Sequence, residues 1–372
     1  MMSGGLMSAW RRGAAAAGWS IPWGSMTFAR ASEGSYLTAA PGTGASAFLA
    51  WASSGVLREE DRGDGAGALA LLEGTRTNQV VRSQEIDNGA WTTAGTMTIT
   101  AGQDSPDSGT TAERLQAASG TNIRYQTLTP GSGYRSVSAW VRAASGTVDH
   151  YIYVYDGSAV YYAGQTGIST TYRRLSVTQS LAAGAGNVGA ADGRAGGIIS
   201  AGARDAYVAL MQLEAGKFAT SAIRTAGVSA TRLADSLTMT AGIPAGLFTD
   251  RGEFANFSPV FDVADLVFND VAWLLSIDGA DDGIRVYHDG TDCYVQALEA
   301  GVVVAASQAQ GWSAHDVMGA VSWDPAAGLV YVDGVAGPAG TPWSWTPGSI
   351  RVGGVYGGTD EAYARLGALR SW

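Results

Sequence analysis

The sequence predicts an all-β protein built from antiparallel sandwiches, and three observations support that fold class. Short runs of residues alternate between apolar and polar with a period of two, as strands with one buried face do. The chain holds 52 glycines, spread between these runs without a three-residue period, which indicates many turns. Long amphipathic helical stretches are hard to find.

Five runs in the middle of the chain have the strand pattern. They are Thr96–Thr100, Tyr134–Arg142, His150–Tyr155, Tyr172–Thr178 and Ala206–Leu213. In the second run, alternation places Val137, Ala139 and Val141 on one face. The segment 181–204 between the last two runs is almost pure Ala and Gly, so we predict a loop there.

Length and composition limit the domain organisation and the partners. At 372 residues the chain exceeds what one hydrophobic core usually fills, so we expect two globular modules and an extension. The net charge is −10 and no Lys/Arg cluster occurs, which argues against a nucleic-acid partner. No stretch approaches the ~20 apolar residues that span a bilayer, so we expect no membrane insertion. Cys293 is the only cysteine, which excludes an intrachain disulfide.

Four phrases in the first two thirds of the chain have a recognisable order and spacing. They are Leu71–Asn78, Arg82–Trp91, Ser105–Leu115 and Gln212–Ser221. Together they resemble the jelly-roll, carbohydrate-binding-like module that is common in phage tail and head-fibre proteins. Upstream, Met26–Tyr36 resembles the opening phrase of the same virion proteins. The resemblance implies a part that binds surfaces, not one that performs chemistry.

A second module begins near Asp235, with successive strands joined by Asp/Gly turns. Met318–Pro325 and Gly328–Gly334 form a hairpin pattern that resembles the concanavalin-like, laminin-G-like sandwich. The ending Ala364–Trp372 is similar to the last strand of that family. We therefore divide the chain into an N-terminal attachment segment (1–70), a jelly-roll module (71–235) and a concanavalin-like sandwich (236–372).

The sequence carries no recognisable catalytic constellation. The three histidines, His150, His288 and His315, lack a nucleophile context and the paired spacing of a zinc site. Glycoside hydrolysis, the enzymatic alternative, needs two carboxylates that flank the scissile bond. The nearest phrase, Glu59–Asp64, lies in the irregular leader and ends in Asp. We therefore expect no catalytic residues.

A partial calcium-loop pattern occurs in the second module. Asp278–Gly283 is followed by Asp289, with Ala280 at a position where an oxygen ligand belongs. Two Asp/Gly hairpin turns explain the same residues. The alternative is a structural calcium ion at Asp278, Asp281, Asp282 and Asp289. Apart from this ion, we expect no cofactor.

Aromatic residues give the candidate glycan-binding sites, because sugar rings stack on flat aromatic faces. Tyr151, Tyr153 and Tyr155 share one face of their strand, opposite Ile152 and Val154. Polar and aromatic neighbours are Asp149, Asp156, Tyr161 and Tyr162. The alternative is that the tyrosines pack beneath a neighbouring sheet or subunit.

Tryptophans in the second module give further candidates. Trp312, Trp343 and Trp345 lie in Gly/Pro-containing loops, where they either contact ligand or cap the core of the sandwich. Three more tryptophans are predicted to be core residues: Trp91, Trp140 and Trp323.

The first resemblance implies a phage or phage-like virion fibre, spike or decoration protein, made in the bacterial host cytoplasm and displayed on the particle surface. Its expected partners are host-surface polysaccharide and, through the N-terminal segment, other virion proteins. Multivalent binding of weak glycan sites favours a homo-oligomer, and we expect a trimer. The alternative is a purely structural virion component without glycan binding.

Overall fold

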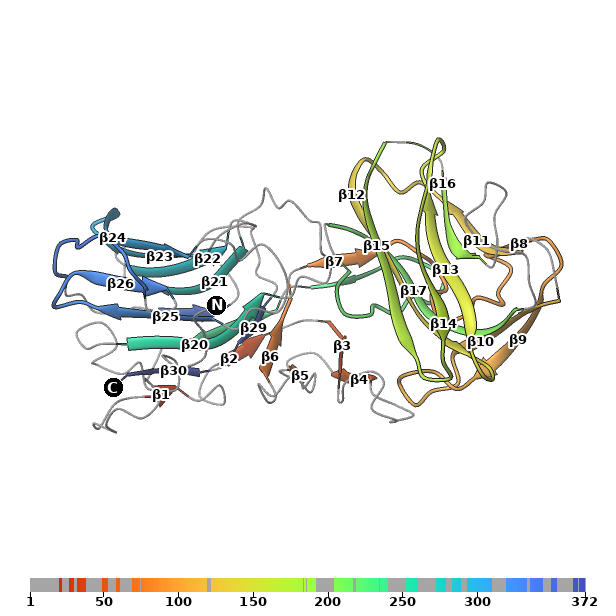
Figure 1. Cartoon of the computed structure of the whole chain (residues 1–372), viewed down its shortest axis with the longest axis horizontal. Helices are drawn as coiled ribbons and strands as arrows, with labels where there is room; N and C mark the ends of the chain where they lie inside the picture. The colour runs from red at the N-terminus through yellow and green to blue at the C-terminus, as the bar shows by residue number, and fades with distance from the viewer. Residues whose placement is uncertain are drawn as a thin grey trace. The chain divides into compact units, whose positions relative to one another are not determined.

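The computed structural model is built of β-strands, and no helix occurs among the described residues (Figure 1). The described residues are 20–21, 27–29, 32–37, 49–52, 58–60, 69–73, 75–118, 122–182, 184, 186–191, 204–216, 219–233, 235–239, 252–259, 272–278, 283–288, 293–309, 319–332, 335–343, 349–352, 364–366 and 368–371. The prediction of an all-β protein with antiparallel sandwiches is confirmed.

The chain forms two compact units, and each is described by itself. The first, which we call the first sandwich, lies within Ala29–Asp235. The second sandwich takes in most of Ser236–Trp372 and also the strand β1 (Ser20–Ile21).

The first sandwich contains two five-stranded antiparallel sheets. The β12 sheet has the order β15 (Arg173–Leu181), β12 (Gly133–Ala143), β17 (Arg204–Ala215), β10 (Ala112–Ala117), β9 (Thr98–Gln103). The β13 sheet has the order β14 (Val160–Ile168), β13 (Val148–Tyr155), β16 (Gly186–Ala191), β11 (Ile123–Leu128), β8 (Thr92–Ala94). Figure 1 shows the two sheets as adjacent layers.

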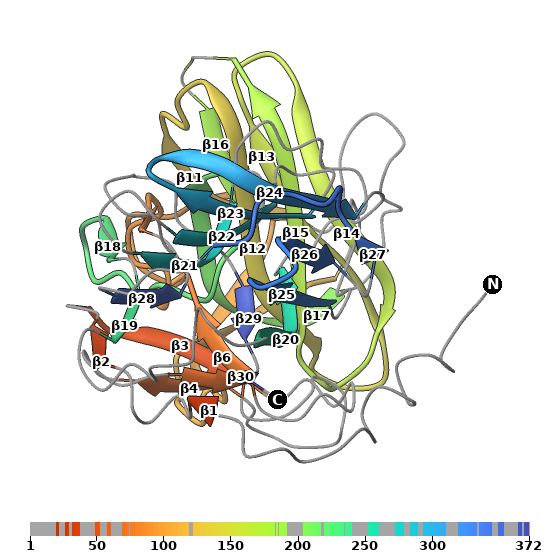
Figure 2. The same cartoon turned by 90° about the vertical axis from the view of Figure 1, so that its left-hand side faces the viewer.

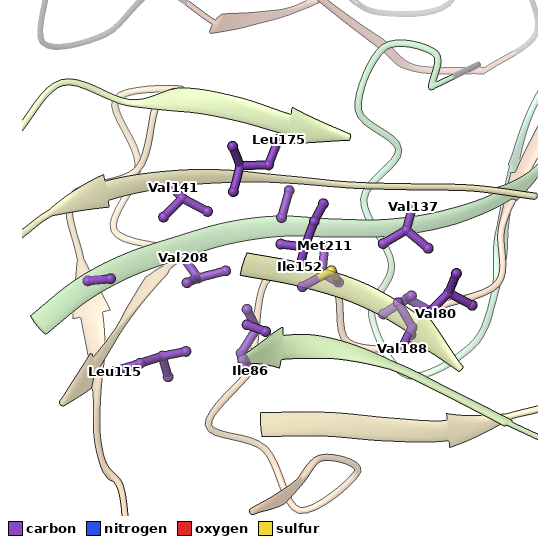
Figure 3. Packing of buried hydrophobic residues seen from close by; sticks show 14 of the residues in the cluster. Val80, Ile86, Leu115, Val137, Val141, Ile152, Leu175, Val188, Val208 and Met211 are labelled. Atoms are coloured by element: carbon purple, nitrogen blue, oxygen red, sulfur yellow. The ribbon is translucent and has the colours of Figure 1, made fainter. Parts of the chain in front are cut away.

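Alternation along the strands builds the core between these sheets (Figure 3). Val137, Ala139 and Val141 of β12 are all 0% exposed, as the sequence predicts. They pack with Ile152 and Val188 of the β13 sheet. Fully burying one aliphatic side chain of this size contributes about 1.5–3 kcal/mol, so the facing valines and isoleucines hold the two sheets together.

A bulge interrupts the alternation of β17. Its pairing with β12 shifts register between Ser138 and Trp140, and Leu210 has a φ of 54°. The extra residue turns Leu210 to the outer side of the sheet, and Met211 returns to the main core. Strand bulges bend a sheet locally in this way.

Residues upstream of position 71 cover the outer side of the β12 sheet. The hairpin of β3 (Gly34–Leu37) and β4 (Leu49–Ala52) brings Leu49 and Trp51 against Trp140. Two further antiparallel pairs complete the first sandwich: β5 (Arg58–Glu60) with β6 (Leu69–Leu72), and β7 (Arg76–Asn78) with β18 (Ala230–Arg232). The leader thus supplies part of the packing of this unit.

The predicted loop over 181–204 contains a strand, and that prediction is wrong in this part. β16 lies at the centre of the β13 sheet, between β13 and β11. Val188 and Ala190 face the core and are buried. The sequence does not predict this strand because glycine and alanine have low strand propensity. Here they form a strand because small residues allow close packing against the neighbouring strands.

The second sandwich also has two antiparallel layers (Figures 1 and 2). One has the strand order β27 (Val335–Ala336), β26 (Leu329–Val332), β25 (Gly319–Asp324), β20 (Gly252–Pro259). In this layer β29 (Ala364–Leu366) and β30 (Ala368–Ser371) both pair with β20, and β1 pairs with β30. The other runs β2 (Thr27–Ala29), β19 (Ser236–Met239), β28 (Ser349–Val352), β21 (Ala272–Asp278), β22 (Gly283–His288), β23 (Cys293–Glu299), β24 (Val302–Ala309). Trp323 is 1% exposed and belongs to the core, as predicted.

Candidate functional site: the tyrosine face of the first sandwich

Tyrosines of β13 point away from the core of the first sandwich. Ile152 and Val154 lie in the core at 0% exposure, so their neighbours Tyr151, Tyr153 and Tyr155 lie on the opposite side of the sheet. Tyr151 and Tyr155 are half-buried, whereas Tyr153 is 7% exposed. The alternation is as the sequence predicts, and the middle ring is covered much more than its neighbours.

Strand register extends this surface over neighbouring strands. Tyr162 of β14 pairs with Tyr153, Tyr153 pairs with Gly189 of β16, and Gly189 pairs with Tyr125 of β11. Directly paired residues lie on the same side of a sheet. We call the outward side that carries Tyr125, Tyr151, Tyr153, Tyr155 and Tyr162 the tyrosine face. Tyr162 is 40% exposed, so the face reaches solvent at the β14 edge.

Sequence reasoning missed Tyr125, because in β11 the polar residues face the core and the tyrosine faces outward. Arg124 and Gln126, at 6% and 5% exposure, are buried, and Tyr125 faces outward. Inside, Arg124 donates to the carbonyl oxygens of Ile86 at 2.7 Å and Asn88 at 2.9 Å. Buried polar groups do not destabilise a protein core when they are hydrogen-bonded.

Gln126 is also hydrogen-bonded on the core side, and both of its bonds go to one residue. Its amide donates to the carbonyl oxygen of Val81 at 2.9 Å and accepts from the Val81 N–H at 2.8 Å. These bonds to the segment Val81–Asn88 turn the polar side of β11 inward. No signal within β11 itself identifies Tyr125, because the bonding partners lie about 40 residues away in the chain.

Two glycines allow the rings and strands of the face to come close. A Cβ at Gly164 of β14 would overlap the ring of Tyr151, so that ring lies where a side chain at 164 would stand. A Cβ at Gly189 would collide with the carbonyl oxygen of Arg124 and come within 2.9 Å of the Tyr125 Cβ. The rings of Tyr151 and Tyr162 meet edge to face, with centroids 6.1 Å apart.

The predicted carboxylates beside the tyrosines have structural partners. Asp149 accepts the Gly167 N–H at 2.8 Å. Asp156 Oδ1 accepts the N–H groups of Ser158 at 2.9 Å and Ala159 at 2.8 Å, which closes the turn after β13. The backbone N–H of Ala159, followed by that of Ser158, lowers the pKa of Asp156 to about 2. Asp156 therefore anchors a hairpin turn.

A neutral hydrogen-bonding group accompanies the rings. Asn187 of β16 pairs with Tyr155 on one side and with Thr127 on the other, so it lies on the tyrosine face. Its Oδ1 is buried without a hydrogen-bond partner. Among the described outward-facing residues of the β13 sheet, the only charged side chain is that of Asp149. The face therefore offers aromatic rings, hydroxyls and an amide.

The candidate residues of the second sandwich are placed only in part. Trp343 is 4% exposed and its backbone N–H donates to the Pro325 carbonyl oxygen at 3.2 Å, so it covers the core of the sandwich. Asp278 is the last residue of β21. The other candidates lie outside the described residues: Trp312, Trp345, Asp281, Asp282 and Asp289. In the described part of the chain, no group of three or more His, Cys, Asp or Glu side chains is placed to hold a metal ion.

Two of the four phrases that carry the first family resemblance, Leu71–Asn78 and Gln212–Ser221, meet in a buried polar network. Glu73 Oε2 lies 3.2 Å from Arg232 Nη1, with 3% and 0% of the two side chains exposed. Glu73 also accepts the Ser221 N–H at 2.7 Å. Glu214 accepts the N–H of Thr220 at 2.7 Å and its hydroxyl at 2.6 Å. These residues tie the beginning and the end of the first sandwich together, which is a structural role.

Among the described carboxyl groups of the first sandwich, Glu113 has the largest resolved pKa shift. It is 3% exposed, and its Oε2 has no hydrogen-bond partner. Burial, and then the negative charge of Asp87, raise the pKa of Glu113 to about 8. A carboxyl group that stays protonated at neutral pH is a possible proton donor. Glu113 follows Ala112 on β10 of the β12 sheet, whereas the tyrosine face belongs to the outer side of the other sheet.

His150 of β13 is also buried in the first sandwich. It is 1% exposed, and neither ring nitrogen has a hydrogen-bond partner. Burial, together with the positive charge of Arg204, lowers its pKa to about 3. The imidazole is therefore neutral at physiological pH.

Comparisons with known proteins concern the fold. No protein-family model matches the sequence, and no curated protein matches it. One similar structure is the enzymatically active domain of tailspike protein 4 of bacteriophage CBA120, with 15% identity and a TM-score of 0.29 over 37% of this chain and 21% of that chain. Another contains the CBM22-1 and GH10 modules of endo-1,4-beta-D-xylanase 10B of Clostridium thermocellum in complex with xylohexaose, with 12% identity and a TM-score of 0.27 over 41% of this chain and 30% of that chain. This chain thus spans less than a third of either protein's length.

No helix in the described part of the chain has the length and apolar character needed to cross a bilayer.

Proposed function

We propose that this protein is a surface component of a phage-type virion and that its tyrosine face binds a polysaccharide of the bacterial surface. The observation that carries the binding role is the set of five tyrosines brought onto one outward side of the β13 sheet by strand register. Aromatic rings beside neutral hydrogen-bonding groups suit sugars, which have apolar ring faces and hydroxyl edges. The virion role rests on the resemblance of the phrases between Leu71 and Ser221 to phage fibre proteins.

The same proposal covers assembly and location. The protein acts as a homo-oligomer, a trimer in the simplest case, because several weak sites together give strong attachment. Its N-terminal segment joins it to other virion proteins. It is made in the host cytoplasm and displayed on the particle. Binding without catalysis is the role that we assign to it.

A binding assay with the purified full-length chain tests this function. Saturable binding to intact bacterial cells or to their extracted capsular and lipopolysaccharide glycans is expected. Tyr162→Ala and Tyr125→Ala should each weaken it by about tenfold, as loss of an aromatic contact residue does. Tyr134→Ala is the matched control, because Tyr134 is 37% exposed on the β12 sheet and should leave binding unchanged.

Failure of the folded wild-type oligomer to bind any surface glycan would favour the purely structural alternative. In that case the tyrosine face is a contact between subunits, and Tyr162→Ala should change the mass measured by sedimentation.

A further inference from the structure

We infer that the ligand of the tyrosine face is an uncharged polysaccharide segment that lies across the strands, from Tyr162 on β14 to Tyr125 on β11. The inference rests on the proposed function and specifies the chemical class and the direction of the ligand. It uses the pairing of the strands, the exposure of the rings and the charge of the outward-facing side chains.

The direction follows from strand pairing. Tyr162, Tyr153, Gly189 and Tyr125 stand directly opposite one another in four neighbouring strands. Neighbouring strands are about 4.8 Å apart, so the row extends over roughly 14 Å, a length that a few linked sugar rings cover. Gly189 interrupts the row of rings with a position that has no side chain.

Ring exposure supports this direction. Tyr162, at one end of the row, is 40% exposed, and Tyr125, at the other end, is half-buried. Tyr153, between them, is 7% exposed. A ligand therefore has aromatic surface available at both ends of the row, whereas the middle ring is covered.

The charge of the face excludes anionic sugars as its preferred ligands. Carboxylate, sulfate and phosphate groups are recognised by Arg and Lys, and the described outward-facing residues of the β13 sheet contain neither. Arg124, the arginine of β11, is 6% exposed and makes its hydrogen bonds on the core side. The only charged side chain among these described residues, Asp149, is negative, and the chain as a whole carries a net charge of −10, which repels polyanions.

Hydrogen-bonding capacity agrees with the absence of positive charge. A carboxylate oxygen of Asp149 is an acceptor on this face. A sugar hydroxyl donates to such groups, whereas a carboxylate, sulfate or phosphate of an anionic glycan offers only acceptors at neutral pH.

Calorimetric titration of the full-length protein tests the inference. The ligands are matched series of uncharged oligosaccharides (glucan, xylan and mannan fragments) and anionic ones (uronate, sialylated and sulfated fragments), each at low and high salt. Binding to at least one neutral series is expected, with affinity that rises with chain length to a plateau. It should not change with salt, because no ion pair forms.

Two pairs of variants test the direction of the ligand. Tyr162→Ala and Tyr125→Ala should each reduce neutral-ligand affinity by about tenfold, whereas Tyr134→Ala should not. If Tyr151→Ala and Tyr155→Ala abolish binding while Tyr125→Ala has no effect, the ligand lies along β13 and the inferred direction is wrong.

The ligand series separates this inference from the function on which it rests. Binding only to anionic fragments, weakened by salt, would overturn the inferred ligand class and leave glycan attachment intact. Absence of binding to either series, with the chain folded and oligomeric, would overturn the proposed function itself.

Discussion

The ring of Tyr151 lies in the space above Gly164 that any larger residue at position 164 would need. The two residues are direct partners in the pairing of β13 and β14. Because glycine has no Cβ, the tyrosine can lean across to the neighbouring strand and meet Tyr162 edge to face. The arrangement of the tyrosine face therefore depends on a residue that has no side chain.

Gly164→Ala should change the tyrosine face without removing any aromatic ring. The added methyl group displaces the Tyr151 ring and with it the edge-to-face contact that holds Tyr162, so glycan affinity should fall by about tenfold. The free energy of unfolding should fall by about 1–3 kcal/mol. Titration calorimetry and urea unfolding measure the two effects. Gly89→Ala is the matched control, since no atom lies within 4 Å of its added Cβ. Unchanged affinity in Gly164→Ala would show that the position of Tyr151 is immaterial to binding.

Gly189→Ala should act on the fold more than on the rings. Its methyl group meets the main chain of β11 at Arg124 and the Tyr125 Cβ. A paired strand cannot move away from such an overlap as a flexible side chain can. We expect a loss of unfolding free energy of about 3 kcal/mol or more, together with loss of binding. Denaturant unfolding monitored by circular dichroism gives the answer, and wild-type stability would contradict the close packing of β16 on β11.

Arg232→Met should destabilise the first sandwich strongly. It leaves the carboxylate of Glu73 buried without its cation, which costs about 3–5 kcal/mol. Arg82→Met is the control, because the pair of Arg82 and Glu85 is 36% and 41% exposed and should contribute about 1 kcal/mol or less. Comparable losses in the two variants, measured by urea unfolding, would contradict a structural role for the buried pair. Adding Glu73→Gln to Arg232→Met should recover part of the lost stability.

Stability should fall as pH rises through the titration of Glu113. Burial and Asp87 raise its pKa from 4.5 to about 8, so the folded state holds a proton that the unfolded state has released between these values. The stabilising contribution is complete below about pH 4.5 and is lost as pH approaches about 8, an effect on the order of a few kcal/mol. Glu113→Gln removes this titration. Urea unfolding at pH 5 and pH 8 should show a larger decrease for the wild type than for Glu113→Gln, and equal decreases would refute the assignment.

Local patterns in the sequence predicted what depends on neighbours along the chain. The all-β class, the buried row Val137, Ala139 and Val141, and the alternation of Ile152 and Val154 with the tyrosines of β13 all follow from a side-chain period of two. The observed burial agrees at each of these positions. Trp91, Trp140 and Trp323, predicted as core residues, are buried at 3%, 4% and 1% exposure.

Other features depend on contacts between distant residues, and these only the tertiary structure decided. Tyr125 belongs to the tyrosine face because the polar partners Arg124 and Gln126 are hydrogen-bonded inside by the segment Val81–Asn88. β16 exists because Gly189 and its neighbours fit between β13 and β11.

The sequence by itself thus determined the fold class and which side of β13 carries the tyrosines, since both follow from local periodicity. The tertiary structure decided which strands adjoin β13 and which other rings share its face. The reason is physical: strand neighbours and buried hydrogen-bond partners are set by pairing across long stretches of chain, and a local pattern holds no information about that pairing.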